Sequence, residues 1–381
     1  MEIKRFTQYF KINEDVNTKK FMIIPEGSSL PTSGVVKIGF DPTGKDLHLG
    51  HLVVLQMVKK LKEAGMDVHV ILGTFTAQLG DPSGRDATRP MLGETETKAN
   101  ANAIISQLHR VLGSDITIHY NHEWFNKMTL PEMMQILSKY TVDYLMSRDA
   151  FQKRKESGNT IGMHELIVPI LQGLDSVELK ANVEVGGTDQ LFNFMLSREV
   201  QSKAGQTPEI CVMAPIINGT DGRKMSKSFN NCIYINDTPK NVFGKAMSIS
   251  DEVMFQWYEL FFEGYNKEEH PMKLKKELAT EITDMIWGKG SGDKERKSFE
   301  SISSGALPTD IKEYQYDSDN VVTFISTVAK MSKSDARRLL QQGGVTVSKD
   351  GINLSKIDMA YEPENGDILK IGKRNYAKII K

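Results

Sequence analysis

The chain has 381 residues, enough for two or three domains, and its 39% hydrophobic and 25% charged residues are ordinary for a globular protein. The formal net charge of −1 gives no overall attraction to nucleic acid, and two cysteines, Cys211 and Cys232, argue against a disulfide framework. The first twenty residues are polar and no apolar run could span a bilayer, so we expect no signal peptide, no membrane association and a cytoplasmic location.

The N-terminal two hundred residues alternate strand-like and helix-like segments. After a strand at about 37–43, the periodicity predicts a helix that Gly65 ends, a strand at 68–73, a helix at 97–112, a strand at 116–120, a helix at 130–147 and a late strand at 211–217. Such alternation predicts a doubly wound parallel sheet covered by helices, with ligands bound beyond the carboxyl ends of its strands.

The motif His48-Leu49-Gly50-His51 follows the first of these strands. We expect Asp46 to cap the next helix, which places both histidines in its first turn and on one face. A helix N-terminus suits phosphate, and Gly50 allows a nucleotide base to lie close to the backbone. The alternative interpretation is two polar histidines beside a helix start.

A second motif, Lys224-Met225-Ser226-Lys227-Ser228, follows the turn-rich segment 218–222. Lys224 and Lys227 are cations on flexible stems that can follow moving phosphates. Alone, the segment is equally consistent with a solvated basic loop. Together the two motifs indicate a site that activates a carboxylate with ATP and stabilises the charge that grows as pyrophosphate leaves.

The rest of the chain divides by composition. Residues 235–304 are predicted mostly helical, with helices at 254–262 and 271–287 and a flexible break at 290–292. The polar segment 303–320 is predicted to be a linker before a small α/β module. The predicted domains are a Rossmann-like catalytic domain at 1–232, a helical domain at 233–304, a linker at 305–320 and an RNA-binding domain at 321–381.

The five letters of the second motif recur at Lys330-Met331-Ser332-Lys333-Ser334, directly before a basic helix. We expect Ser334 or Asp335 to cap that helix and interpret this copy as part of an RNA-binding surface. From residue 321 to 381 there are 11 Lys and Arg against 6 Asp and Glu, a net charge of about +5, which fits contact with a phosphate backbone.

With these motifs the chain resembles the bacterial-type tyrosyl-tRNA synthetases, a family of class I aminoacyl-tRNA synthetases, over nearly its full length. The resemblance rests on six short motifs in order: 39–43 (GFDPT), 48–51 (HLGH), 80–84 (GDPSG), 171–176 (LQGLDS), 186–190 (GGTDQ) and 224–228 (KMSKS). The tail from Val322 resembles an S4 RNA-binding domain, which would grip tRNA by phosphate and shape contacts.

The resemblance implies a two-step reaction. The carboxylate of L-tyrosine attacks the α-phosphate of ATP bound with Mg²⁺, and the terminal ribose of tRNA(Tyr) then attacks the resulting adenylate. It also implies a homodimer, with no metal bound by the protein itself. No protein nucleophile is required, because positioning and electrostatic stabilisation carry the catalysis.

The resemblance further implies a role for individual residues. The phosphates would be held by His48, His51, Lys224 and Lys227. The remaining ATP contacts would come from Gly39, Asp41, Thr43, Gly50, Gly187, Asp189, Met225, Ser226 and Ser228. Tyrosine would be held by Asp81 and Gln172 at its ammonium group, by Gln190 at its carboxylate and by Asp175 at its phenol hydroxyl. RNA would be held by Lys333, Arg337 and Arg338.

Three positions depart from the family pattern: Val168 and Leu174, where relatives often carry Tyr, and Thr74, where many carry Asp. Losing one hydrogen bond to a charged group typically costs about 1.5–3 kcal/mol. Two alternatives to a tyrosine–tRNA ligase therefore stay open. One is a relative that activates another amino acid or serves another acceptor, and the other is an inactive RNA-binding relative.

Overall fold

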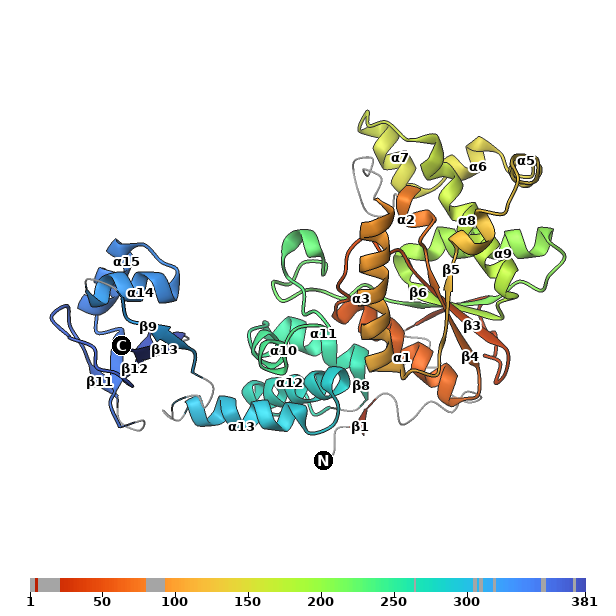
Figure 1. Ribbon diagram of the computed structural model, residues 1–381. Helices are drawn as coiled ribbons and strands as arrows, with labels where there is room; N and C mark the ends of the chain where they lie inside the picture. Colours follow the sequence, from red (N-terminus) through yellow and green to blue (C-terminus); the bar gives the residue numbers. More distant parts are fainter. Residues whose placement is uncertain are drawn as a thin grey trace. The chain divides into compact units, whose positions relative to one another are not determined.

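The computed structural model describes residues 4–5, 21–79, 93–263, 265–303, 307, 311–317, 320–350, 354–372 and 375–381. The chain divides into two compact units, residues 1–292 and 293–381 (Figure 1). The predicted boundary at 232/233 lies inside the first unit and stays a prediction.

The first unit is built on a six-stranded sheet with the order β2-β7-β6-β3-β4-β5. β2 is antiparallel to its neighbour and the other strands are parallel. The chain runs outward from β3 through β4 to β5, and then returns to place β6 and β7 on the other side of β3. The sheet is therefore doubly wound, as predicted, with its switch point between β3 and β6. The strands are β2 (Met22–Ile24), β3 (Val35–Phe40), β4 (Asp67–Leu72), β5 (Thr117–Tyr120), β6 (Val183–Gly187) and β7 (Ile210–Ala214).

Both faces of the central strand β3 are buried. Val36 and Ile38, 0% and 2% exposed, lie on one face, and Lys37, 1% exposed, lies on the other. Strands buried on both faces are normally continuous apolar runs, so a lysine in the middle of one needs a partner. Its cross-strand neighbour in β6 is Glu184.

The helices of the sheet domain are α1 (Leu49–Glu63), α2 (Thr76–Leu79), α3 (Glu94–Leu112), α4 (His122–Phe125), α5 (Leu130–Leu137), α6 (Val142–Met146), α7 (Asp149–Glu156), α8 (Met163–Leu179) and α9 (Leu191–Lys203). Two of the three helices predicted in the sheet domain are present, as α1 and α3, and the other helices were not predicted individually. The single helix predicted at 130–147 is wrong, because the chain turns after Leu137 and α6 starts anew. Thr141 caps α6 by accepting a hydrogen bond from the Tyr144 backbone N–H at 3.3 Å.

The first unit continues with α10 (Pro239–Met247), α11 (Asp251–Phe261) and α12 (Pro271–Trp287), and α13 (Ser291–Ser303) begins at its end. A two-residue ribbon pairs β1 (Lys4–Arg5) with β8 (Phe262–Glu263). The break predicted at 290–292 is wrong in part, since Ser291 and Gly292 start α13. The turn is made by Gly288 and Gly290, whose φ angles of +95° and +92° favour glycine.

The second unit begins within α13 and holds a five-stranded sheet in the order β11-β10-β12-β13-β9 together with α14 and α15. The elements are β9 (Glu313–Gln315), α14 (Val321–Ala329), α15 (Lys333–Gln341), β10 (Val345–Ser348), β11 (Ser355–Lys356), β12 (Ile368–Ile371) and β13 (Asn375–Ile380). β9 lies within the segment predicted to be a linker, so that prediction is wrong for these residues. A short polar strand at a sheet edge has no alternating apolar pattern to reveal it.

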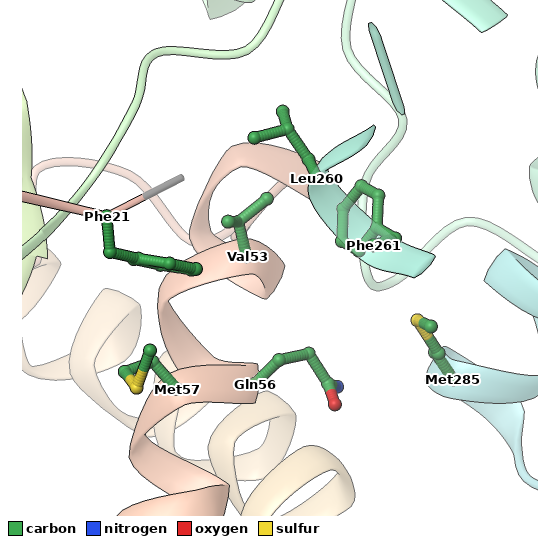
Figure 2. Close-up of a pocket in the computed structure, with 7 residues that line it drawn as sticks. All are labelled: Phe21, Val53, Gln56, Met57, Leu260, Phe261 and Met285. Carbon is green, nitrogen blue, oxygen red and sulfur yellow. The ribbon is translucent and has the colours of Figure 1, made fainter. Parts of the chain in front are cut away.

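In the described part of the chain, no helix combines the length and the apolar character that a bilayer crossing requires. A small apolar cavity lies between α1, α11 and α12 (Figure 2). None of the residues that line it belongs to the predicted site, and we assign it no function. The lining residues are Phe21, Val53, Gln56, Met57, Leu260, Phe261 and Met285.

Candidate functional site

The first motif forms the start of α1. His48, not Asp46 as predicted, is the N-cap, and Asp46 instead accepts a hydrogen bond from Asn236 Nδ2 at 3.1 Å. His48 Nδ1 accepts from the Gly50 backbone N–H at 3.2 Å, and His51 Nδ1 accepts from the His48 backbone N–H at 3.0 Å. Each ring thus uses Nδ1 as an acceptor, so the neutral tautomer of each carries its proton on Nε2.

The two histidines are neutral at physiological pH. Burial, followed by the neighbouring His51 and the charges of Lys227 and Lys224, lowers the pKa of His48 to about 2. Burial and Lys227 lower the pKa of His51 to about 4. Both rings therefore offer an Nε2–H donor at the positive end of α1, and neither adds a full charge.

The second motif is tied to the first by backbone pairing. The Leu49 N–H donates to the Ile233 carbonyl and the Ile235 N–H donates to the Leu47 carbonyl, both at 2.9 Å. His48 and Tyr234 form the bridge between these hydrogen bonds. Since residues 233–235 follow the lysine loop directly, this pairing holds the loop beside the histidines. The sequence predicted both motifs but not this link.

The loop 224–228 is anchored at its centre. The Met225 side chain is 4% exposed, and its N–H donates to the Ile217 carbonyl at 2.9 Å. Ser226 accepts a hydrogen bond from the Ser228 N–H at 3.2 Å, which closes a short turn. Asn231 accepts from the Ser226 N–H at 2.8 Å and donates to the Lys224 carbonyl at 3.1 Å. Sequence reasoning missed Asn231, because its partners are set by the fold of the loop.

The two lysines of this loop lie near different parts of the site. Lys227 is near the first motif, since a Cβ on Gly44 would stand 3.0 Å from its Nζ. The Lys224 Nζ lies 3.8 Å from Asp189 Oδ2, and both side chains are about half exposed. The structure therefore brings together the residues predicted to hold the phosphates and the residue predicted to meet the ribose.

Glycines shape the space around these groups. A Cβ on Gly39 would meet nothing within 4 Å, so the carboxyl end of β3 is open on the side that Lys37 faces. On Gly187 a Cβ would stand 2.5 Å from Asp189 Oδ1, so glycine there lets that carboxylate fold back. The space beside Gly50 is filled by the His48 ring at 3.0 Å and by Ile217 at 3.1 Å. The observed reason for this glycine is packing, and its contact with adenine stays a prediction.

Asp41 and Thr43 continue from β3 in a tight turn. The Thr43 N–H donates to the Asp41 carbonyl at 2.7 Å, and Asp41 Oδ1 accepts from the Thr76 hydroxyl at 2.7 Å. A Cβ on Gly73 would lie 1.9 Å from the same carboxylate oxygen. Asp41 is therefore held in place by α2 and by the turn that leads into it.

Asp175 lies on α8 and is 5% exposed, so its carboxyl group is buried. Its Oδ1 accepts from Trp124 Nε1 at 3.0 Å, and its Oδ2 accepts from Asn121 Nδ2 at 3.5 Å. Burial raises the pKa of Asp175 to about 7, although Lys37 and both hydrogen bonds act in the opposite direction. Trp124 and Asn121 were not predicted, because neither α4 nor the residue that links it to β5 carries a motif of its own.

Gln172 lies one turn before Asp175 on the same face of α8. Its Nε2 donates to Glu184 Oε1 at 3.0 Å and its Oε1 accepts from Asn193 Nδ2 at 2.9 Å. The same Asn193 nitrogen donates to Gln190 Oε1 at 2.9 Å. The two predicted amino-acid contacts, Gln172 and Gln190, are thus joined through one buried asparagine.

A cluster of buried charged side chains adjoins Gln172. Lys37 Nζ lies 2.8 Å from Glu184 Oε1 and donates to the Ser176 hydroxyl and, at 3.3 Å, to the Gln172 carbonyl. Burial alone would lower the pKa of Lys37, but Glu184 and Glu209 outweigh it and raise the pKa. Burial and Glu184 raise the pKa of Glu209 well above its ordinary value. The sequence analysis missed this cluster, although a lysine and a glutamate inside apolar strands could have indicated it.

The three departures from the family pattern have different surroundings. Val168 is 3% exposed and lies on the same face of α8 as Gln172. Leu174 packs against an apolar cluster that includes Phe151 and Leu166. The Thr74 hydroxyl lies 2.6 Å from His122 Nδ1.

The remaining predicted residues fall elsewhere. Asp81 lies outside the described residues, as does the whole motif 80–84. Within the described ranges, no three His, Cys, Asp or Glu side chains are grouped as a metal site. In the second unit Lys333, Arg337 and Arg338 are exposed on α15, and Arg338 pairs with Asp335.

The cap predicted for α15 is wrong, because Ser332 caps this helix rather than Ser334 or Asp335. Asp335 occupies the third position of the first turn, where its carboxylate accepts a hydrogen bond from the Ser332 hydroxyl at 2.7 Å.

Residues 32–298 match the model of the class I tRNA synthetases for W and Y. A tyrosine–tRNA ligase of Dehalococcoides mccartyi is 40% identical, and one of Francisella tularensis is 38% identical, each match covering 91% of both chains. One of Carboxydothermus hydrogenoformans is 38% identical over 99% of this chain and 96% of its own.

Two solved structures share the fold. A truncated mitochondrial tyrosyl-tRNA synthetase of Aspergillus nidulans has a TM-score of 0.60 at 21% identity, covering 71% of this chain and 86% of that one. A tyrosyl-tRNA synthetase of Archaeoglobus fulgidus, complexed with L-tyrosine, has a TM-score of 0.56 at 21% identity, covering 70% of this chain and 91% of that one.

Proposed function

This chain belongs to the tyrosyl-tRNA synthetases, class I aminoacyl-tRNA synthetases that act as tyrosine–tRNA ligases, and from that premise we propose how its residues share the reaction. ATP is a substrate, and we propose that it arrives as its Mg²⁺ complex. The carboxylate of L-tyrosine attacks the α-phosphate, pyrophosphate leaves, and the adenylate is passed to tRNA(Tyr). These steps require the two substrates to be aligned and the phosphate charge to be stabilised.

The nucleotide half of the site supplies both kinds of stabilisation. His48 and His51 donate from Nε2–H to phosphate oxygens at the N-terminus of α1, where the helix dipole favours negative charge. Lys227 and Lys224 supply full positive charge from the facing loop. Asp189, made accessible by Gly187, accepts from the ribose hydroxyls. Gly39, Asp41, Thr43 and the main chain of residues 225–228 complete the proposed ATP contacts.

The amino-acid half recognises three groups of the substrate. The Asp175 carboxylate accepts the phenol hydroxyl and is already oriented by Trp124. Gln172 and Asp81 hold the ammonium group, and Gln190 holds the carboxylate next to the α-phosphate. Rejection of phenylalanine follows because a buried carboxylate that lacks the hydroxyl is left with an unmet acceptor.

The observation that carries the proposal is the pairing of residues 47–49 with 233–235, which puts the phosphate-binding motifs together near Asp189. ATP–pyrophosphate exchange, measured with each standard amino acid separately, tests it. We expect exchange with tyrosine and nearly none with phenylalanine. Exchange with another amino acid instead would indicate a changed specificity, and exchange with none would favour an inactive RNA-binding relative.

We further propose that the chain acts as a homodimer in the cytoplasm and that its C-terminal unit binds tRNA through Lys333, Arg337 and Arg338. Four exposed apolar side chains between residues 130 and 163 support the dimer: Leu130 and Met134 of α5, Val142 of α6 and Met163 of α8 are 73%, 57%, 56% and 70% exposed. We propose that they form one apolar face, since exposed apolar side chains that lie together mark an interface.

Sedimentation measurements test the assignment of this face to the dimer. We expect Met134→Glu to convert the dimer to monomer, because it places a charge in the apolar contact. Met272→Glu is the matched control, because Met272 is 48% exposed on α12, outside this face. A dimer that survives Met134→Glu would place the interface elsewhere.

A further inference from the structure

Three side-chain amides, those of Gln172, Asn193 and Gln190, form a hydrogen-bonded chain from α8 to the start of α9. Asn193, on the first turn of α9, is 0% exposed and lies between Gln172 of α8 and Gln190. Its Nδ2 donates to the Oε1 of each glutamine, at 2.9 Å in both cases. Asn193 is therefore in contact with the two glutamines to which the proposed function assigns the ammonium group and the carboxylate of the substrate.

A fixed charge decides which way these amides point. Glu184 Oε1 lies 2.8 Å from the ammonium group of Lys37, which has only donors, so this oxygen acts as a hydrogen-bond acceptor. Gln172 must then donate its Nε2 to Glu184, which turns its Oε1 toward Asn193. Because that oxygen needs a donor, Asn193 turns its Nδ2 toward Gln172. The same Nδ2 also donates to Gln190, which therefore accepts with its Oε1.

We propose that Asn193 is a positioning residue for tyrosine binding, which transmits the orientation set by Glu184 from Gln172 to Gln190. The proposal rests on the proposed function, in which Gln190 meets the substrate carboxylate. With Oε1 of Gln190 held by Asn193, its Nε2 is the end left for that carboxylate. A Gln190 turned the other way would set a carbonyl oxygen against a carboxylate, which repels it.

The two glutamines depend on Asn193 to different degrees. Gln172 is held at both ends, by Asn193 and by Glu184, and so keeps its orientation if Asn193 is removed. Among the described residues, Gln190 joins this network through its hydrogen bond with Asn193. Loss of Asn193 should therefore affect recognition of the substrate carboxylate and spare recognition of the ammonium group.

Asn193→Leu, which introduces an apolar side chain of similar size, tests this. It removes Asn193 Oδ1, which is buried and has no hydrogen-bond partner among the described residues, but it also takes the donor from Gln172 Oε1 and Gln190 Oε1, so we expect a folded chain with a lower Tm. The matched control is Ser197→Ala, one turn further along α9, because Ser197 is also 0% exposed and its hydroxyl is likewise unpaired in the part of the chain described. Within the described structure, the Ser197 hydroxyl forms no hydrogen bond with either glutamine.

The measurement is the dissociation constant of three ligands on the full chain. L-tyrosine carries both end groups, 3-(4-hydroxyphenyl)propanoate lacks the ammonium group, and tyramine lacks the carboxylate. For Asn193→Leu we expect affinity to fall by about 10- to 100-fold for L-tyrosine and the propanoate, the usual effect of losing a hydrogen bond to a charged group. Tyramine should change by less than about threefold, and Ser197→Ala should leave all three unchanged.

Equal weakening of all three ligands would show a general structural role and overturn the proposal, and so would no weakening of any. If Asn193→Leu does not fold by circular dichroism, Asn193→Ala is the second variant. It removes the same Nδ2 donor without adding a buried charge, so it should give the same ligand pattern. Failure of the proposed function is distinguishable, because then the unaltered chain would show neither tyrosine binding nor tyrosine-dependent exchange.

Discussion

The buried carboxyl of Asp175 predicts that tyrosine binds more tightly as pH rises through neutrality. Burial raises its pKa to about 7, so at pH 6 most of the free protein carries a protonated Asp175. The ionised carboxylate can accept from the phenol hydroxyl, from Trp124 and from Asn121 together, whereas the protonated form gives up part of its acceptor capacity. The ionised form is therefore the one that binds tyrosine.

The magnitude follows from the same pKa. If only the ionised form binds, the apparent dissociation constant is multiplied by 1 + 10^(pKa − pH), which changes by about tenfold between pH 6 and pH 8. The pH dependence of folding stability has the opposite sign to that of tyrosine binding. A folded-state pKa of about 7 against the ordinary 3.8 favours the neutral form, so folding free energy of about 4 kcal/mol is lost as pH rises from about 4 to 7.

The assay is the KM for tyrosine in pyrophosphate exchange at pH 6, 7 and 8, with ATP saturating. We expect KM to fall about tenfold across this range, and the thermal shift produced by tyrosine to be larger at pH 8. Asp175→Asn is the control, because its amide does not titrate and should give a high, flat KM. A flat profile in the unaltered chain would refute the reasoning.

Three further predictions concern the nucleotide half. Lys227→Ala should lower the exchange rate by about 10²- to 10³-fold with tyrosine affinity unchanged, as expected for a lost transition-state contact, and should raise the pKa of His51 as followed by NMR titration. Asn231→Ala should destabilise the lysine loop and lower kcat more than it changes the KM for tyrosine, and an equal effect on both would contradict its role as a loop tie. Gly73→Ala should lower the Tm and abolish exchange, since its Cβ would stand 1.9 Å from Asp41 Oδ1, whereas Gly244→Ala, with nothing within 4 Å, should leave both intact.

Local patterns predicted what depends on neighbouring residues. The helix expected at 271–287 is α12 to the residue, because Pro271 starts it, Gly288 ends it and its apolar residues recur at helical spacing. The histidine and lysine motifs were recognised because each is a compact string. The parallel sheet followed from the alternation of elements, and its switch point places both motifs where that fold binds ligands.

Long-range contacts account for most of what the sequence did not predict. Asn231 and Asn193 are single polar residues whose roles appear only when the chain is folded around them. Helix caps were misplaced for the same reason. His48 displaced Asp46 as a cap because the backbone pairing with residues 233–235 fixes where α1 begins. A residue's chemistry can be read from sequence, but its partner is set by topology.

The two halves of the site hold their charges in opposite ways. In the nucleotide half the loop lysines help to keep His48 and His51 neutral, so positive charge resides on flexible side chains and the rigid rings act as donors. A bound triphosphate brings negative charge that offsets the lysines and raises the pKa of both rings. In the amino-acid half the fixed Lys37–Glu184 pair orients amides, and Asp175 gains its charge with the substrate. In the proposed site, the positive charge assigned to the leaving pyrophosphate thus lies on mobile side chains. The carboxyl group assigned to substrate discrimination is buried, held by Trp124 and Asn121, and takes up its charge when tyrosine binds.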